Sequence, residues 1–303
     1  MTITYLTLKT NGGKKISLNR AYKSVPDYTV PSVLKLGINQ SVPNILSTGL
    51  DVLIPILNGT VCDNGANLMT GSSGGDNTTD NTTTYKQGAG LSDATSQNLI
   101  ANGTNATKIW TISDLTTYGA NAVSTKYIGL WFYIKDATAL AKLKSSGTCL
   151  EFRLGADSTT NYYSKVYTVA ELVVGWNFLG GTGLLSTWTV NGTPGTLNDF
   201  QIRITTNNAT DTFVAGDVIY DLLRQCELAD TKRTINSLTI DESTFQASME
   251  FKVNAGEASG FLINGASVEN TDSSVIVSDI SKNDDNSKSD TDIFIDTFVD
   301  RYI

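Results

Sequence analysis

The chain has 303 residues, enough for about two domains that each bury a core. Its formal net charge of −8 and the lack of a dense basic stretch exclude nucleic-acid binding, since several phosphates would have to be neutralised at once. It contains no histidine, which excludes Ser-His or Cys-His nucleophiles and His-ligated zinc. With only 17% charged residues and abundant Gly, Ser, Thr and Asn, the composition favours an ordered, β-rich protein.

Charge is distributed unevenly along the chain. Residues 1–60 hold six Lys and Arg against two Asp and Glu (net +4), residues 61–233 twelve against fifteen (net −3), and residues 234–303 four against thirteen (net −9). If the two ends fold together, the basic and acidic groups attract one another; the alternative is two separately solvated charge runs.

The first 84 residues predict extended structure with polar loops. A strand at 3–9, an Asn11-Gly12-Gly13 turn and apolar spacing around Ile16 and Leu18 predict a hairpin. Four prolines before residue 57 favour short extended segments over helix. Between Val61 and Thr84 the chain is polar and of low complexity, which predicts a surface loop.

The middle of the chain predicts a β-sandwich. The nearly continuous apolar run 127–134 indicates a central strand, and the alternation of apolar and polar residues at 150–154 and 200–204 indicates strands with one buried face. Residues 218–223 supply another strand, and a short helix is expected around Ala137 to Lys144. Many short strands with Gly-rich turns favour a sandwich or jelly roll.

The C-terminal part predicts a small antiparallel sheet. Period-two alternation from Phe245 to Val253 indicates a strand, followed by apolar segments at 261–263, 275–277 and the last eleven residues. Between them, NDDNSKSD (283–290) has the composition of a Ca²⁺ loop but lacks the spacing and the closing Glu of an EF-hand, so an exposed charged turn is expected.

Phrases in the middle region, among them KYIGLWFYIKDATAL, LEFRLGADSTTNYY, VVGWNFL and NDFQIRIT, carry a resemblance. They resemble the concanavalin-like and carbohydrate-binding jelly rolls that recur in bacteriophage virion proteins. The C-terminal phrases MEFKVNAGEASGFLINGASV and TDIFIDTFV are similar to a small β-domain of phage tail, baseplate and fibre-attachment proteins, and YTVPSVLKLGINQSVPNILSTGLDVLIPI looks like its front half.

The resemblance implies an all-β fold in which a jelly-roll β-sandwich is inserted into a small antiparallel β-domain. The host domain would comprise residues 1–60 plus 234–303, and the inserted sandwich residues 61–233. Such an insertion is tolerated at an exposed loop because the flanking strand ends stay close together.

Candidate site residues fall into two groups. Sandwich modules grip sugars by stacking a flat ring on the sugar face, so Tyr162, Tyr163, Tyr167 and Trp188, in or near predicted loops, are the glycan-binding candidates. Trp131 and Trp176 are expected in the core. Asp217 and Asp221 on one strand face are the candidates for a structural calcium, and no other cofactor is expected.

We therefore expect a non-enzymatic structural component of a bacteriophage virion, located in the neck, tail, baseplate or fibre. Its partners would be further copies of the chain in a homo-oligomer, other virion proteins and a host surface glycan, without membrane insertion. The alternative is a carbohydrate-binding module or a glycan-active enzyme, for which Glu151, Glu171, Asp217 and Asp221 are the available carboxylates.

Two further patterns bear on location. The first residues lack an export signal, so synthesis in the host cytoplasm is expected. Three cysteines without CxxC spacing predict buried free thiols.

Overall fold

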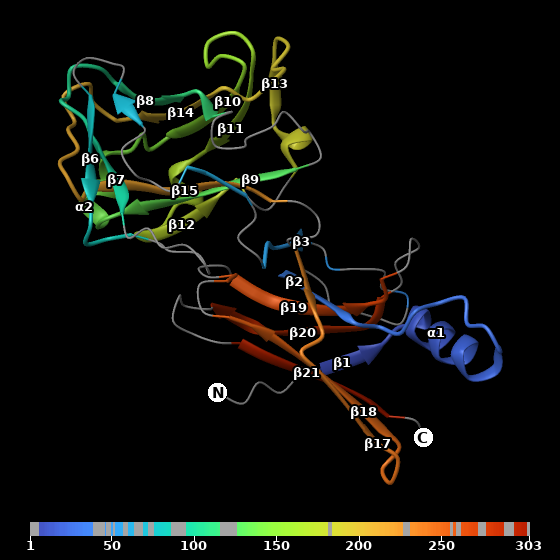
Figure 1. The fold of residues 1–303 in the computed structure, drawn as a ribbon. Coiled ribbons are helices and arrows are strands. Elements are labelled where there is room, and N and C mark those ends of the chain that lie inside the picture. The colour runs from blue at the N-terminus through green and yellow to red at the C-terminus, as the bar shows by residue number, and fades with distance from the viewer. Residues whose placement is uncertain are drawn as a thin grey trace. The chain divides into compact units, whose positions relative to one another are not determined.

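In a computed structural model the chain folds into two compact units, which are described separately (Figure 1). Unit 1 comprises residues 1–57 and 228–303, and unit 2 comprises residues 58–227. The structure describes residues 6–38, 46, 50, 52–56, 60–63, 69–71, 76–85, 95–115, 126–180, 184–226, 231–254, 257–258, 262–271, 277–287 and 294–301.

The two ends of the chain share one antiparallel sheet in unit 1, which we call sheet I. Its strand order is β1-β20-β19-β2-β16, and β3 pairs with β2. The bounds are β1 Leu6–Lys9, β2 Val33–Ile38, β3 Val52–Leu53, β16 Lys232–Thr234, β19 Leu262–Glu269 and β20 Val277–Ser287. Pairing of β1 with β20 and of β2 with β19 confirms that the N- and C-terminal segments build one small β-domain.

The N-terminal hairpin prediction is wrong, because a helix follows the first strand. β1 pairs with β20 instead, and α1 (Asn11–Tyr22) begins after Thr10, whose hydroxyl accepts a hydrogen bond from the Gly13 N–H at 3.1 Å. A threonine cap satisfies an N–H group that the first helical turn leaves unpaired. This local bond therefore favours a helix start where Gly12 and Gly13 suggested a turn.

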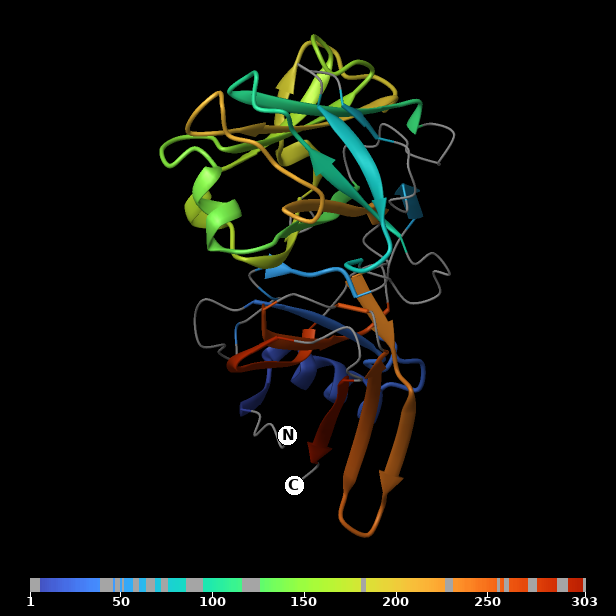
Figure 2. The ribbon, with the colours of Figure 1, turned by 90° about the vertical axis from the view of Figure 1, so that its left-hand side faces the viewer.

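The second sheet of unit 1, sheet IV, has the order β17-β18-β21. The bounds are β17 Ser237–Asp241, β18 Gln246–Val253 and β21 Phe294–Arg301. The strand predicted at 245–253 is confirmed, whereas the charged turn predicted at 283–290 is wrong for its first half. Residues 283–287 continue β20, because that strand finds backbone partners on β19, with Ile263 opposite Asn286. The β17–β18 hairpin projects from the rest of unit 1 (Figures 1 and 2).

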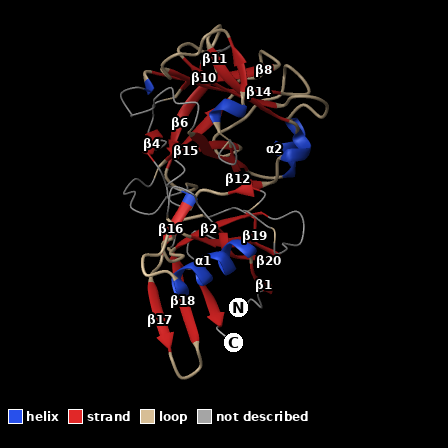
Figure 3. Ribbon diagram, turned by 90° about the vertical axis from the view of Figure 1, so that its right-hand side faces the viewer, coloured by secondary structure: helices blue, strands red, loops and turns tan. Residues whose placement is uncertain are grey.

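Unit 2 is a sandwich of two antiparallel sheets. Sheet II has the order β13-β11-β10-β14-β8-β5, and sheet III has the order β12-β9-β15-β7-β6 with β4 paired to β15. The bounds are β4 Thr60–Asp63, β5 Thr70–Gly71, β6 Asn77–Asn81, β7 Ser96–Ile100, β8 Thr107–Ser113, β9 Tyr127–Ile134, β10 Leu150–Gly155, β11 Tyr162–Tyr167, β12 Gly175–Leu179, β13 Thr189–Asn191, β14 Asp199–Thr205 and β15 Val218–Cys226. The predicted all-β sandwich is confirmed, and strands dominate the fold (Figure 3).

The core of unit 2 lies between sheets II and III. Phe152 and Phe200 of sheet II are fully buried with ring centroids 5.8 Å apart, and Phe200 also lies 6.1 Å from Tyr220 of sheet III. Alternation along each strand sends every second side chain into this core. Cys62, Cys149 and Cys226 are buried thiols outside any disulfide, as predicted.

Short elements complete unit 2. The predicted helix is confirmed as α2 (Ala137–Lys142), capped by the Asp136 carboxylate, which accepts from the Ala139 N–H at 2.8 Å. Two 3-10 turns are η2 (Val169–Glu171) and η3 (Leu185–Thr187). The loop predicted at 61–84 is wrong in part, because β4, β5 and β6 form there; β6 pairs with β7 along its whole length. Polar Thr and Asn side chains suit such an edge strand, since the backbone supplies the pairing.

Candidate functional site

The outward face of sheet II carries a cluster of charged and amide side chains. In β10, Leu150, Phe152 and Leu154 point into the core, so Glu151 and Arg153 project from the opposite face. In β14 the same alternation projects Gln201 and Arg203. The register places Glu151 opposite Arg203 and Arg153 opposite Gln201, so the four side chains are cross-strand neighbours.

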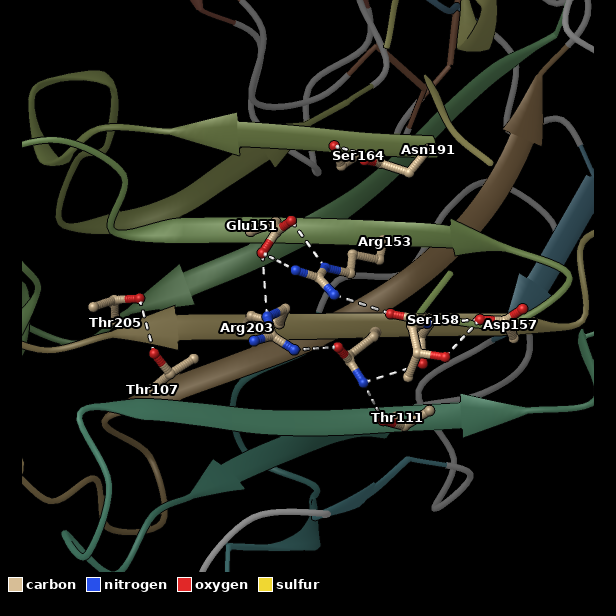
Figure 4. A network of polar contacts seen from close by, with 12 residues as sticks. Thr107, Thr111, Glu151, Arg153, Asp157, Ser158, Ser164, Asn191, Arg203 and Thr205 are labelled. Carbon is tan, nitrogen blue, oxygen red and sulfur yellow. Dashed lines mark hydrogen bonds and ion pairs between the residues drawn. The ribbon is translucent and has the colours of Figure 1, made fainter. Parts of the chain in front are cut away.

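In this cluster the Glu151 carboxylate binds the guanidinium groups of both Arg153 and Arg203 (Figure 4). Glu151 accepts from Arg153 Nε at 2.9 Å and from Arg153 Nη2 at 3.2 Å, and Arg203 Nε lies 3.2 Å from the same carboxylate. The side chains of Glu151, Arg153 and Arg203 are only 20%, 18% and 23% exposed. Burial, followed by the nearby positive charge of Arg153, lowers the pKa of Arg203, while Glu151 opposes this shift.

Hydrogen bonds extend from the ionic cluster to both of its sides. Arg203 Nη1 donates to Gln201 Oε1 at 2.8 Å, and Gln201 Nε2 donates to Thr111 Oγ1 at 3.0 Å and to Ser158 Oγ at 3.2 Å. Arg153 Nη1 donates to the Ser158 carbonyl at 3.1 Å. These bonds hold the guanidinium and amide groups in fixed positions on three adjacent strands, β10, β14 and β8.

The turn between β10 and β11 is held by a single carboxylate beside the cluster. Asp157 accepts hydrogen bonds from the N–H groups of Thr159 and Thr160 and from the amide of Asn161. These bonds, led by the Thr160 N–H, lower the pKa of Asp157 far below its usual range. The turn is thereby ordered next to Ser158, which joins the polar network.

The predicted glycan-stacking rings are mostly buried. Tyr167 and Trp188 are 8% and 4% exposed and belong to the core cluster, and the Tyr167 hydroxyl accepts from the Gly180 N–H at 2.7 Å. Tyr163 packs against the same core. Tyr167 and Trp188 therefore present no open face for a sugar, whereas Tyr163 points inward with Tyr167 but stays partly exposed.

Tyr162 differs from the other predicted rings because it lies with the polar cluster. The centre of the Arg153 guanidinium sits 4.4 Å from the ring centroid, a cation–π contact. The ring is 9% exposed, and the Arg153 guanidinium covers one of its faces, so Tyr162 packs against Arg153 and does not present a ring face to a ligand.

The two predicted calcium residues, Asp217 and Asp221, lie in different surroundings, and a structural calcium stays a prediction. Asp217 accepts a hydrogen bond from Lys142 Nζ at 3.0 Å and lies 3.6 Å from Lys135 Nζ. Two ammonium groups therefore compensate its negative charge. Burial alone would raise the pKa of Asp217, but the bonds from Lys142 and the Val214 N–H, with both lysine charges, lower it overall. Asp221 is fully buried, and no group of three metal-ligating side chains is found in the described ranges.

The expectation of a core position is confirmed for Trp131, which is 3% exposed, but not for Trp176, and Trp131 is buried on the outer face of sheet III rather than between the two sheets. Ile128, Leu130 and Phe132 of β9 belong to the core cluster, so Trp131 points to the other face of sheet III. There its ring lies 6.4 Å from Trp176 and 5.0 Å from Phe178. Trp176 is partly exposed, because β12 is the edge strand of the sheet.

The polar cluster was missed at the sequence level although a signal was present. The phrases Leu-Glu-Phe-Arg-Leu (150–154) and Phe-Gln-Ile-Arg-Ile (200–204) each place an acceptor and an arginine two residues apart between apolar positions. In a strand, such a pattern puts both polar groups on one face. Only the pairing of β10 with β14 shows that the two faces coincide.

No protein-family profile and no curated protein sequence matches the chain. Among solved structures, the chain is similar to the CBM22-1 xylan-binding domain of Paenibacillus barcinonensis Xyn10C, with 14% identity, 60% of this chain and 99% of that domain covered and a TM-score of 0.32. The tandem CBM22-1–CBM22-2 domain of the same protein gives 12% identity, coverage of 74% and 65% and a TM-score of 0.28. An exo-beta-agarase gives 13%, coverage of 60% and 26% and 0.24. These are distant structural similarities to carbohydrate-binding domains and an agarase.

Within the part of the chain that the structure describes, no helix is long and apolar enough to cross a bilayer.

Proposed function

We propose that unit 2 is a carbohydrate-binding module whose site is the outward face of sheet II. The observation that carries the proposal is that Arg153 and Arg203 both bind the Glu151 carboxylate. The hydrogen-bond network continues from Arg203 through Gln201 to Thr111. Sugar hydroxyls both donate and accept hydrogen bonds. A rigid surface that offers amide, hydroxyl, carboxylate and guanidinium groups within one network can satisfy several hydroxyls at once.

The charges of the cluster favour an acidic saccharide. Two guanidinium groups share a single carboxylate, which leaves a net charge of +1 on three largely buried side chains. An arginine fork binds a planar carboxylate or a sulfate through two parallel hydrogen bonds. We therefore assign uronate-containing or sulfated polysaccharides as the ligand class.

Binding without catalysis is the function that the carboxylates support best. Glu151 is held by two arginines, and Glu171 accepts from the N–H and hydroxyl of Thr168 in a capping box. Asp217 is held by Lys142 and Asp221 is fully buried. A glycosidase needs one protonated and one ionised carboxyl group flanking the bond, and hydrogen bonds and neighbouring cations favour the ionised form of Glu171 and Asp217.

Affinity electrophoresis of the full chain tests this proposal. Gels containing alginate, polygalacturonate, xylan or agarose should retard the protein most strongly with the acidic polymers. Arg203→Ala should weaken binding by at least about tenfold, because it removes a bidentate donor. Lys144→Ala is the matched control, since it removes a positive charge from an exposed position of unit 2. Equal retardation of both variants, or none for the wild type, would overturn the proposal.

Assembly into a bacteriophage particle, with unit 1 as the attachment domain, stays a prediction from the sequence. Recovery of the chain from purified particles by mass spectrometry would test it independently of glycan binding.

A further inference from the structure

Unit 1 contains an apolar groove that the glycan proposal does not use. Its volume is about 680 Å³, and it lies where the segment before β2 meets sheet IV. It is lined by Val30, Pro31, Ser32, Ile235, Leu238, Ile240, Asp241, Glu242, Phe245, Gln246, Ala247 and Met249.

Large apolar side chains around this groove are open to solvent. Leu238, Ile240 and Phe245 are 53%, 67% and 68% exposed, and β17 is the terminal strand of sheet IV. Phe245 also has a φ angle of +53°, in the left-handed region that disfavours a bulky side chain. An aromatic side chain kept both strained and exposed is typical of a binding surface.

The charges at the groove limit what can dock there. Its lining contains two acidic residues, Asp241 and Glu242, and no basic one, so the groove carries a net charge of −2. A docking partner should therefore combine apolar side chains with positive charge.

Helix α1 presents that combination on a face that unit 1 does not bury. Its buried residues are Gly13 and Ile16, whereas Leu18 and Tyr22 are 63% and 83% exposed. At about 100° per residue, Leu18 and Tyr22 follow Lys14 on one side of the helix, opposite to Ile16. Lys14 and Lys15 are both exposed. This surface is a basic helix face with two apolar side chains one turn apart.

We infer that the α1 helix of one copy of this chain docks into the β17–β18 groove of a second copy. Leu18 and Tyr22 would cover Leu238, Ile240 and Phe245, while Lys14 and Lys15 approach Asp241 and Glu242. Helix-in-groove docking uses apolar anchors at this spacing.

The surface area that this contact would bury is that of a weak interface. Burying the exposed parts of Leu18, Tyr22, Leu238, Ile240 and Phe245 would remove roughly 600 Å² of mostly apolar surface, below the roughly 1,000 Å² of a stable specific interface. We therefore expect association in the range of tens to hundreds of micromolar. Because the two surfaces differ, successive copies either close a ring or extend into a filament, unless two copies pair reciprocally.

Sedimentation equilibrium of the full chain from about 5 µM to about 1 mM tests the inference over the range expected for a weak interface. The wild type should gain mass with concentration. Ile240→Ser and Leu18→Ser should each raise the dissociation constant at least about tenfold, and Val190→Ser, which removes a 54% exposed valine from unit 2, should not. Raising the salt from about 0.1 to about 1 M should weaken association, because it screens the lysine–carboxylate attraction.

Mixing the variants distinguishes this contact from its alternatives. An equimolar mixture of Ile240→Ser and Leu18→Ser keeps one intact helix and one intact groove, so it should regain a two-copy species. A mixture that stays monomeric, or a Leu18→Ser variant that assembles like the wild type, would overturn the inference. The second result would indicate edge-to-edge pairing of β17 with itself. A wild type that stays monomeric to about 1 mM would also overturn it.

Discussion

The substitution Glu151→Gln tests whether the shared carboxylate holds the outward face of sheet II together. It keeps the shape of the side chain but removes the single negative charge that Arg153 and Arg203 share. Exposed ion pairs contribute about 0–1 kcal/mol, and breaking a fully buried pair costs about 3–5 kcal/mol. Because these side chains are 18–23% exposed, a loss of about 2 kcal/mol is expected.

Tryptophan fluorescence is the suitable assay for this variant. All four tryptophans, Trp110, Trp131, Trp176 and Trp188, lie in unit 2, so their emission reports the unfolding of that unit alone. For a unit of this size, about 2 kcal/mol corresponds to a fall in Tm of about 4–8 °C. Asp80→Asn, which neutralises an exposed carboxylate on β6, is the control and should change stability by less than about 0.5 kcal/mol.

A result for Glu151→Gln that matches the control would refute this reasoning. It would mean that water screens the two guanidinium groups from each other, and that the cluster is not preorganised. A rise in stability would refute it as well.

Four further predictions follow from the described contacts. Tyr167→Phe should lower the free energy of unfolding by about 1 kcal/mol, because it removes the acceptor of the Gly180 N–H, and it should leave retardation in glycan gels unchanged. Reduced retardation would indicate that Tyr167 takes part in glycan binding. Bonds from Ser243 and Thr244 lower the pKa of Asp241 to about 2, so the β17–β18 turn gains stability from this carboxylate above pH of about 4 and loses it as the pH falls towards 2; carboxyl NMR that finds an ordinary pKa near 4 would contradict this. Exchanging EDTA for about 1 mM calcium should shift Tm by less than about 1 °C, because Lys142 and Lys135 already match Asp217; a rise of several degrees would indicate a metal site. Burial raises the pKa of Cys149 to about 11, so a thiol reagent at pH 8 should modify the unfolded chain at three cysteines and the native chain at none; rapid labelling of the native protein would contradict the burial.

The sandwich could be predicted from the sequence because its strands carry strong local patterns. The apolar run 127–134 matches β9 in full, and the alternating segments at 150–154 and 200–204 became β10 and β14. Helix α1 was missed because Gly12 and Gly13 favour a turn unless the Thr10 cap is recognised. The end of strand β20 was predicted as a turn because its acidic residues resemble a loop, whereas backbone pairing with β19 extends the strand to Ser287.

The site was harder to predict because it depends on register. Tyr163 and Tyr167 alternate into the core, and choosing rings by their closeness to loops could not reveal this. Glu151 and Arg203 are far apart in sequence, and only the pairing of β10 with β14 brings them face to face. Patterns of period two predict which residues share a face, but they do not predict which strands become neighbours.

An NMR titration that follows the arginine Nε–H signals tests the central claim most directly. Addition of an acidic oligosaccharide, such as a tetragalacturonate, should move the Nε–H signals of Arg153 and Arg203 while those of Arg233 and Arg20 stay in place. Signals of Arg153 and Arg203 that do not move, or shifts confined to Arg224, which lies over the Phe178 ring of sheet III, would contradict the assignment of the glycan site to sheet II.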